Sequence, residues 1–532
     1  MRKLLRAVAA SLLLCVLPAA TAVAPGQQGG VIKPRTMYED LQMFSGVLNQ
    51  IRQNHPDSVD SHELIMAAID GMLRAADPHS YVVESVRFSP EREKLMREGK
   101  LYPVPIAWLF VEGAPVVASV APGTAAARAD ILPGDELLAI DGKPVPSRSE
   151  MELDLLLAGA KGSEVTLAFE RRRADGSLVR LERAVKRQKV EEESAVPAAF
   201  MLDAETGYAR IITFATSRAA DDLHDALGAL EKRGMKRLVL DLRDNGGGSV
   251  SEAAQVAGEF LPKGAIVYTA AGRKADVADT GRVGRSFWRS ERRYPIVVMV
   301  NSGTASASEL VAGALQDHDR ALIVGRTSFG KSLLMFGMPL ADGSLVYMVV
   351  GHVKTPCGRV VQRQYRGLTP HEYRRRAGAA VDTAGRPKCR TAGGRTVYGG
   401  GGIVPDVVLP ERAPTPVWLS RVREADLPLK WIAGHVSASG AAYPSLDALA
   451  EAARRGPAAA PGAVADFRRY AEQQGIAIPA DADADRRLDR LIVLSVARAK
   501  WNDEGAYRIA AVIDSEVAAA VEAFGRAREI LK

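Results

Sequence analysis

Residues 200–410 alternate short apolar runs with helical stretches, and this alternation restricts the possible folds more than any other feature of the chain. Runs typical of buried strands fall at 238–242, 266–268 and 296–300, and helical patterns follow the first and the third. Strands and helices in alternation predict an α/β core. At 532 residues the chain is too long for one core, so we expect further domains beside it.

The flanking regions have other patterns. Apolar residues recur at helical spacing over 36–98, until Asp77-Pro78-His79-Ser80 breaks the pattern. From about 100 to 188 short strands alternate with Pro-Gly and Asp-Gly turns, and one helix is predicted over 151–157. The stretch 385–403 is rich in Gly and Arg and predicts a loop. After Pro410 the chain is Ala-rich and helical; this tail has no catalytic signature, and we expect it to pack on the core.

The first residues have the three parts of a secretory signal. A basic head precedes the apolar run 12–17, and the small residues Ala20-Thr21-Ala22 fit a cleavage site. An uncleaved membrane anchor is the alternative, but the apolar stretch is short and ends at Pro18. We therefore expect an exported protein, periplasmic or otherwise extracytoplasmic.

Composition gives no sign of a nucleic-acid partner and leaves one question open. The net charge of +7 arises from 70 basic and 63 acidic residues without a sustained basic block, so it does not argue for nucleic acid, and we expect no such partner. Cleavage of the leader would leave Cys357 and Cys389. In an oxidising compartment these two either pair or remain free thiols.

A candidate nucleophile follows the predicted strand 296–300. Ser306 would lie at a strand-to-helix turn, because Leu310, Val311, Ala314 and Leu315 form one apolar helical face. The positive end of a helix stabilises negative charge that develops on a serine oxygen. Serines at such turns are more often simple helix caps, so this stretch alone does not identify a catalytic residue.

Three glycines, Gly246–Gly248, follow the predicted strand 238–242. Bare backbone N–H groups at the edge of a sheet can hold an oxyanion, and the loss of one such donor costs about 3 kcal/mol of transition-state stabilisation. The alternative is a flexible loop that only turns the chain.

The stretch Gly325–Ser332 matches the phosphate-loop pattern of nucleotide-binding proteins. That pattern requires a helix directly after Lys331, but the next residues predict two strands joined by an Asp342-Gly343 turn. We therefore treat this match as accidental. A lysine flanked by Phe329 and by Leu333-Leu334 can instead act as a general base when burial lowers its pKa. None of the 8 histidines is a better candidate, and His79 and His352 are isolated in the sequence.

Together these segments resemble the C-terminal processing (tail-specific) peptidases, which are serine peptidases with a PDZ domain and a Ser/Lys dyad. The resemblance extends over roughly residues 40–410. Its motifs follow the family order: Asp77–Ser80, the PDZ-like unit, the triple glycine, Thr304–Glu309, Phe329–Lys331, Lys354–Pro356 with Gly358-Arg359, and Gly399–Asp406.

The resemblance implies a role for four residues. Ser306 would be the nucleophile and Lys331 its base, and the backbone N–H groups of Gly248 and Ala307 would form the oxyanion hole. No metal or organic cofactor is implied.

Two positions depart from the family pattern. Met335 stands where the family usually has a glutamine that orients the lysine, and a thioether cannot replace that hydrogen bond. Cys357 stands where serine is usual. Either the dyad works alone, or another side chain such as Gln362 substitutes, or the enzyme is degenerate.

The resemblance also implies a multidomain α/β (α+β) fold, with a crotonase-like α/β protease core, an inserted PDZ-like β domain and helical N- and C-terminal regions. The expected parts are a signal peptide (1–22), an N-terminal helical region (23–98), a PDZ-like domain (99–188), a peptidase core (189–412) and a C-terminal helical region (413–532). PDZ domains hold peptide tails. Here Pro103 and Pro105 fall in the carboxylate-binding loop and lack the N–H, so tail capture and a structural or gating role both stay open.

The leading prediction is a serine endopeptidase that cleaves exported or envelope proteins near their C-termini through an acyl-enzyme. Its partners would be protein or peptide substrates, with peripheral association with the cell envelope and a homodimer as further expectations. The alternative is a catalytically degenerate homologue that acts as a PDZ-type binding scaffold. A phosphate-loop nucleotide hydrolase is a third and weaker hypothesis.

Overall fold

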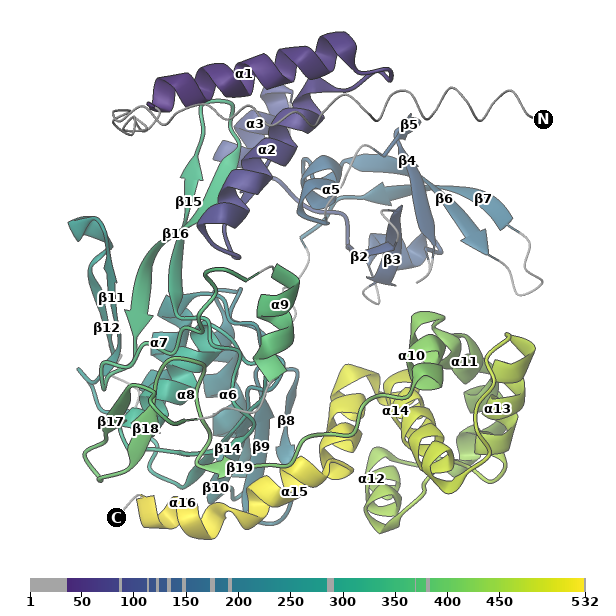
Figure 1. Cartoon of the computed structure of the whole chain (residues 1–532). Coiled ribbons are helices and arrows are strands. Elements are labelled where there is room, and N and C mark those ends of the chain that lie inside the picture. Colours follow the sequence, from purple (N-terminus) through teal and green to yellow (C-terminus); the bar gives the residue numbers. More distant parts are fainter. Residues whose placement is uncertain are drawn as a thin grey trace, which may run out of the picture. The chain divides into compact units, whose positions relative to one another are not determined.

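The computed structural model describes residues 36–85, 89–111, 114–120, 124–131, 135–145, 150–172, 178–189, 194–284, 291–368, 370–378 and 383–530 (Figure 1). The predicted signal peptide lies outside these residues. Two compact units meet between Ile69 and Asp70, and the first contains α1 (Met37–Asn54) and the beginning of α2 (Ser61–Ala76). No helix within the described ranges is both long enough and apolar enough to cross a membrane.

A six-stranded sheet lies in the second unit, with the strand order β19-β14-β13-β10-β9-β8. All neighbouring pairs are parallel except β8 with β9. Parallel neighbours require crossover connections, and helices α6, α7 and α8 provide them. The strands and helices predicted around 238–242 and 296–300 are therefore confirmed. The bounds are β8 (Ala198–Met201), β9 (Thr206–Arg210), β10 (Arg237–Asp241), β13 (Ile296–Val300), β14 (Leu322–Gly325), β19 (Val407–Val408), α6 (Ala219–Lys232), α7 (Val250–Gly258) and α8 (Ala307–Asp317).

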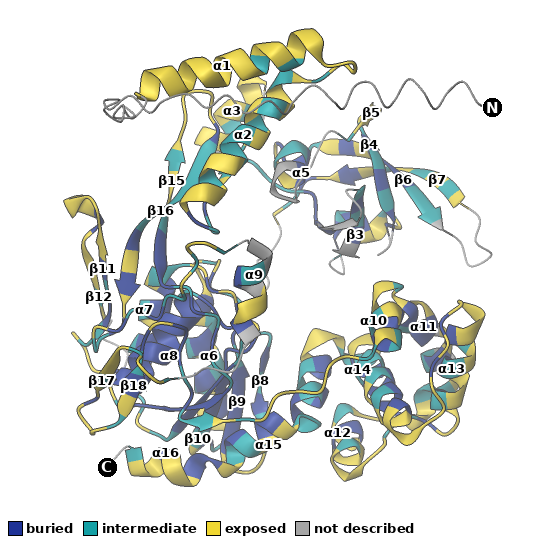
Figure 2. Cartoon of the chain, in the orientation of Figure 1, coloured by how far each residue is buried: buried dark blue, intermediate teal, exposed yellow. Residues whose placement is uncertain are grey.

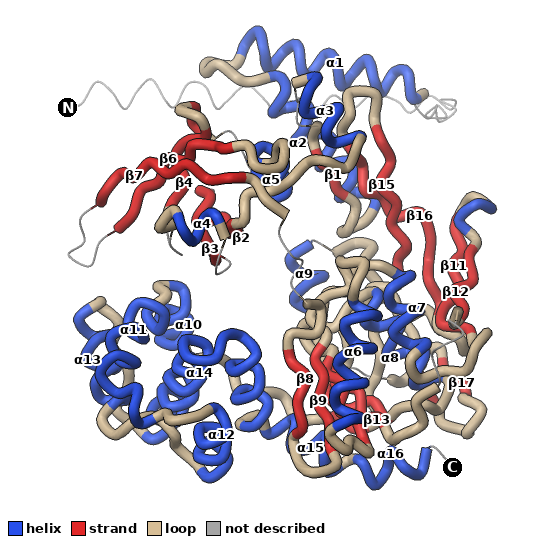
Figure 3. Tube along the Cα trace, turned by 180° about the vertical axis from the view of Figure 1, so that it is seen from behind, coloured by secondary structure: helices blue, strands red, loops and turns tan. Residues whose placement is uncertain are grey.

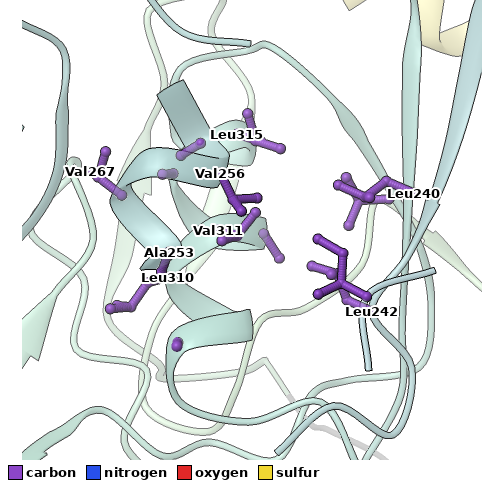
Figure 4. Packing of buried hydrophobic residues seen from close by; sticks show 14 of the residues in the cluster. Leu240, Leu242, Ala253, Val256, Val267, Leu310, Val311 and Leu315 are labelled. Carbon is purple, nitrogen blue, oxygen red and sulfur yellow. The ribbon is translucent and has the colours of Figure 1, made fainter. Parts of the chain in front are cut away.

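Both faces of this sheet are buried, which is why its strands are continuous apolar runs. Leu240 and Val298 belong to one hydrophobic cluster with side chains of α6, α7 and α8, which cover that face in Figure 3. Figure 4 shows Val256 of α7 and Val311 of α8 in this cluster. The intervening residues, such as Val297, contact α15 (Ser515–Glu522) and α16 (Phe524–Ile530) on the opposite face. Figure 2 shows the central strands and helices α6 and α8 mostly in the buried colour.

A second sheet has the order β1-β16-β11-β12, with β15 paired to the other side of β16. β15 and β16 form an antiparallel hairpin directly after Lys331, as predicted. The segment after Lys331 is thus a strand and not a helix, so the phosphate-loop interpretation is wrong. The strand predicted at 266–268 is confirmed, but it lies in this second sheet. The bounds are β1 (Tyr81–Val83), β11 (Ile266–Gly272), η1 (Ala275–Val277), β12 (Asp279–Arg282), β15 (Leu333–Pro339) and β16 (Leu345–Lys354).

The PDZ-like unit has a core of its own, built around Trp108, Leu153 and Phe169. Asp141 and Gly142 both have positive φ, as the predicted Asp-Gly hairpin turn requires. The predicted Pro-Gly turns lie outside the described residues. The elements here are α3 (Pro90–Arg97), β2 (Ile106–Val111), β3 (Ala114–Val120), α4 (Ala125–Arg128), β4 (Glu136–Ile140), β5 (Lys143–Pro144), α5 (Glu150–Leu157), β6 (Glu164–Arg172) and β7 (Leu178–Lys186).

The C-terminal tail is helical, as predicted, and forms a separate hydrophobic cluster. Only its last part packs on the central sheet, through Ala511, Val517 and Phe524. The kink at Trp501 and Asn502 divides α14 into two helical stretches. The elements are α10 (Val417–Glu424), α11 (Leu427–Ser439), η3 (Gly440–Ala442), α12 (Leu446–Arg455), α13 (Ala463–Gln473) and α14 (Ala482–Val512).

The Gly- and Arg-rich stretch that predicted a loop contains a short hairpin, β17 (Lys388–Arg390) and β18 (Thr396–Tyr398). Two ion pairs from Arg395, to Asp319 and Asp406, fix it to the core. A disulfide joins Cys357 to Cys389 and closes a 32-residue separation, so the two thiols are paired. This closed segment contains α9 (Pro370–Arg375) and η2 (Arg376–Gly378).

Candidate active site

The three sequence stretches singled out for chemistry follow β10, β13 and β14, which are adjacent parallel strands. Their carboxyl ends lie at one edge of the sheet, where open α/β sheets bind ligands. The triple-glycine loop lies against Ser306: a Cβ added to Gly247 would be 2.7 Å from the Ser306 Cβ and 2.8 Å from the Ala307 N. The structure therefore places the glycine loop and the serine in direct contact.

Ser306 occupies the N-cap of α8 with φ 57° and ψ −119°. Non-glycine residues held in sparsely populated backbone regions cost about 1–3 kcal/mol each and cluster at functional sites. Asn245 fixes this turn, because its carbonyl accepts hydrogen bonds from the Ala305 N–H (2.9 Å) and the Ser308 hydroxyl (3.0 Å). The turn presents Ser306 at the positive end of a buried helix.

Gly248 and Ala307 each offer a backbone N–H that has no hydrogen-bond partner among the described residues. Phe214 holds the glycine loop from the other side, since its N–H donates to the Gly247 carbonyl (2.9 Å) and its carbonyl accepts from the Ser249 N–H (2.8 Å). A Cβ on Gly248 would be 2.1 Å from the Phe214 carbonyl carbon. Only glycine fits there, and its free N–H can act as an oxyanion donor.

Glu309 is fully buried beneath this turn and connects it to the lysine loop. Its Oε2 accepts hydrogen bonds from the backbone N–H of Ser306 (2.9 Å) and of Lys331 (2.8 Å). Its Oε1 accepts from the Gly330 N–H (2.8 Å) and from the Ser328 hydroxyl. Burial raises the pKa of Glu309 to about 7, although these hydrogen bonds favour the ionised form.

Lys331 is partly buried, and desolvation lowers the pKa of its ammonium below the ordinary value. The charges of Glu309 and Asp77 act in the opposite direction. Within the described part of the chain the Lys331 side chain makes no hydrogen bond or ion pair. A lysine with a lowered pKa supplies the neutral amine that a general base requires.

Gln362 was the candidate substitute for the missing glutamine, and the structure gives it other partners. Its Oε1 accepts from the Ser332 N–H (2.8 Å), and its Nε2 donates to the Tyr373 hydroxyl (3.0 Å). Gln362 therefore supports the backbone next to Lys331 and does not hydrogen-bond the amine. Met335 lies on β15 opposite Val349.

His79 is isolated in the sequence but not in the fold. Its Nε2 lies 3.1 Å from the Tyr373 hydroxyl, and its ring contacts those of Tyr373 and Phe329 edge-on. Desolvation, followed by the charge of Lys331, lowers the pKa of His79 to about 4. His79 is therefore a neutral, half-buried neighbour of the lysine near pH 7.

Sequence reasoning missed Glu309, Asp77 and His79 as members of this site. Glu309 had a usable signal, because Ser-x-x-Glu is the spacing of a capping box at a helix N-terminus. Asp77 and His79 lie in the Asp77–Ser80 stretch, which marked the family resemblance but was given no role. The Asp77 carboxylate accepts from the N–H groups of His79 (2.8 Å) and Ser80 (2.7 Å).

Comparison with known proteins points to one family. Residues 205–374 match the model of peptidase family S41, and residues 116–171 match a PDZ domain. The carboxy-terminal-processing protease of Bartonella bacilliformis is 33% identical over 341 residues, which cover 63% of this chain and 74% of that protein. The chain belongs to peptidase family S41. This S41 peptidase is thus a serine-type hydrolase whose substrates are proteins or peptides.

Two further matches are a second curated relative and a solved structure. The chloroplastic carboxyl-terminal-processing peptidase 2 of Arabidopsis thaliana is 35% identical over 257 residues, or 48% of each chain. A solved photosystem II D1 C-terminal processing protease matches with a TM-score of 0.35 at 26% identity, covering 72% of this chain and 91% of that one. The multidomain α/β fold predicted from the sequence is confirmed for this S41 peptidase, including its PDZ domain. Across the described ranges, no group of three or more His, Cys, Asp or Glu side chains could hold a metal ion.

Proposed function

We propose that this S41 peptidase is an endopeptidase that cleaves exported or envelope proteins near their C-termini, with Ser306 as nucleophile and Lys331 as base. The observation that carries the proposal is the Glu309 carboxylate, which binds the backbone N–H groups of both residues. A fixed backbone relation between two loops provides the positional control that covalent catalysis needs.

The geometry supports the following steps. Ser306 Oγ attacks the scissile carbonyl carbon while its proton passes to the neutral Lys331 amine. The N–H groups of Gly248 and Ala307 hold the oxyanion. The C–N bond then breaks, the Lys331 ammonium returns the proton to the leaving amine, and an acyl-enzyme remains. Water repeats the sequence, giving its proton to Lys331, and releases the acid and the Ser306 hydroxyl.

Three features support an extracytoplasmic substrate near a C-terminus. The relatives in B. bacilliformis and A. thaliana are named for carboxy-terminal processing. The first residues of this chain have the pattern of a secretory signal. The Cys357–Cys389 disulfide is typical of an oxidising compartment.

The proposal is tested with an unfolded protein substrate and four purified forms: wild type, Ser306→Ala, Lys331→Ala and Ser302→Ala. Ser302 lies in the same segment between β13 and α8 and serves as the matched control. We expect cleavage by wild type and Ser302→Ala only. Equal cleavage by all four forms would contradict the roles of Ser306 as nucleophile and Lys331 as base.

A proteolytically silent binding scaffold is the second candidate. Two observations favour it: the Lys331 amine makes no hydrogen bond within the described residues, and Met335 stands where the family usually has glutamine. A fluorophosphonate that labels wild type but not Ser306→Ala would exclude this candidate. Met335→Gln restores an amide at that position. A large gain in turnover in Met335→Gln would show that the natural enzyme is impaired but competent.

A further inference from the structure

Glu516 contacts the catalytic loops from the C-terminal helical region, in which the sequence shows no catalytic signature. It lies in the first turn of α15, and its side chain is 8% exposed. The turn before it is fixed, because Asp514 caps the helix by accepting from the Glu516 N–H (2.9 Å). α15 itself packs on the central sheet through Val517 and Ala520.

The two carboxylate oxygens of Glu516 reach different loops. Oε2 accepts from Arg243 Nη1 (2.7 Å), and Oε1 accepts from Arg326 Nη2 (2.6 Å). Arg243 precedes Asp244-Asn245 and the triple glycine, and Arg326 begins the loop between β14 and β15 that carries Lys331. One side chain thus bridges the loop that carries Gly248 and the loop that carries Lys331.

The bridge lies in a buried, mutually paired cluster. Arg243 is 5% exposed, and its guanidinium also donates to Asp241 (Nε 2.9 Å, Nη2 2.7 Å) and Asp514 (2.7 Å). Burial alone would raise the pKa of Glu516, but hydrogen bonds from Arg412, Arg326 and Arg243 lower it to about 2. The carboxylate is therefore charged under all physiological conditions. Removal of one partner from such a cluster leaves buried charges uncompensated.

We infer that Glu516 is a positioning residue of the peptidase site, which fixes the oxyanion loop relative to the lysine loop. The inference rests on the proposed roles of Gly248 and Lys331. Glu516 touches neither of them and acts through Arg243 and Arg326. A misplacement of about 1 Å in a catalytic group costs about 10²-fold in rate.

The test compares Glu516→Gln with a matched control, Glu451→Gln. Glu451 also binds two arginines, Arg454 (3.2 Å) and Arg455 (2.7 Å), but these lie beside it on α12. The first measurement is amide hydrogen exchange of the peptides covering 244–248 and 326–331. We expect faster exchange of both peptides in Glu516→Gln and wild-type exchange in the control. This readout needs no activity, so it decides the inference even if the proposed function fails.

The second measurement is steady-state cleavage of a peptide substrate. We expect a loss of about 10- to 10²-fold in kcat for Glu516→Gln, with KM within about twofold of wild type. Glu516→Asp keeps the charge but shortens the side chain, and it tests the same bridge if the glutamine variant does not fold. Wild-type exchange in both loops, or an unchanged kcat, in a folded Glu516 variant would overturn the inference. Absence of cleavage and of fluorophosphonate labelling in wild type would instead refute the proposed function.

Discussion

Ser306 and Lys331 lie on different loops, yet their backbone N–H groups donate to the same carboxylate oxygen, at 2.9 and 2.8 Å. That oxygen belongs to Glu309, which is inaccessible to solvent. The backbones of the two residues are thereby held together without a direct bond between their side chains. The relative position of these two backbone segments therefore depends on the buried Glu309 carboxylate.

Glu309→Gln tests this arrangement. A glutamine amide offers one acceptor oxygen for four donors, so we expect kcat/KM to fall by about 10- to 10²-fold in cleavage assays. Glu309→Asp is the companion variant, because it keeps the charge but draws the oxygens back. Wild-type turnover in both variants would show that the shared oxygen is not needed.

The same variant changes how stability depends on pH. The pKa of Glu309 is about 7 in the folded chain against 4.5 for a free glutamate, so the unfolded chain ionises first as the pH rises. The contribution of Glu309 to the free energy of unfolding should therefore decrease between pH 4.5 and 7 and level off above. Urea titrations of wild type and Glu309→Gln at several pH values isolate this contribution, because the other titrating groups are the same in both proteins. We expect the difference, wild type minus variant, to decrease over this range; a constant difference would contradict the raised pKa.

Asp77→Asn should shift the pH profile of activity. The Asp77 charge raises the pKa of Lys331, and the base must be neutral, so kcat/KM rises as the pH passes the lysine pKa. Without that charge the rising limb should move to lower pH. An asparagine oxygen can still accept from the Ser80 N–H, which preserves the turn. A shift to higher pH would contradict the electrostatic role of Asp77.

His79 should make the protein acid-sensitive. Its pKa is about 4 in the fold against 6.5 for a free histidine, so the unfolded chain takes up the proton first as the pH falls. Its contribution to stability is complete above pH 6.5 and is lost as the pH falls toward 4. His79→Asn should reduce this loss in thermal melts between pH 7 and 5. The exposed His352, changed to asparagine, is the control and should reduce nothing.

The triple glycine offers a comparison within one loop. An added Cβ at Gly248 meets the Phe214 backbone at 2.1 Å, whereas at Gly246 it meets nothing within 4 Å. We expect Gly248→Ala to lose about 10²-fold in kcat through displacement of an oxyanion donor. Gly246→Ala should stay within about 0.5 kcal/mol of wild-type stability and keep its activity. Equal effects of the two changes would mean that only loop flexibility matters.

Local patterns in the sequence were sufficient for much of this site. The apolar run 296–300 predicts a strand, and the residues after Lys331 predict a hairpin because two apolar segments flank an Asp-Gly turn. Both predictions depend only on neighbours along the chain. They suffice to reject the phosphate-loop interpretation.

The contacts that surround Lys331 and support its loop join residues far apart in the sequence, and no local pattern predicts such contacts. His79 and Tyr373 are separated by 294 positions, and Arg243 and Glu516 by 273. A lone histidine and a helix-start glutamate have no period or spacing that indicates a partner. For the same reason the sequence could not decide whether Cys357 and Cys389 pair, since pairing depends on the distance between them in the fold.

The backbone of Ser306 has a consequence for stability as well as for chemistry. Its φ of 57° and ψ of −119° suit glycine better than any residue with a side chain. A Ser306→Gly chain should therefore be more stable than one with Ser306→Ala. The proposed nucleophile thus occupies a position where a side chain weakens the fold, and its reactivity would come at a cost in thermal stability.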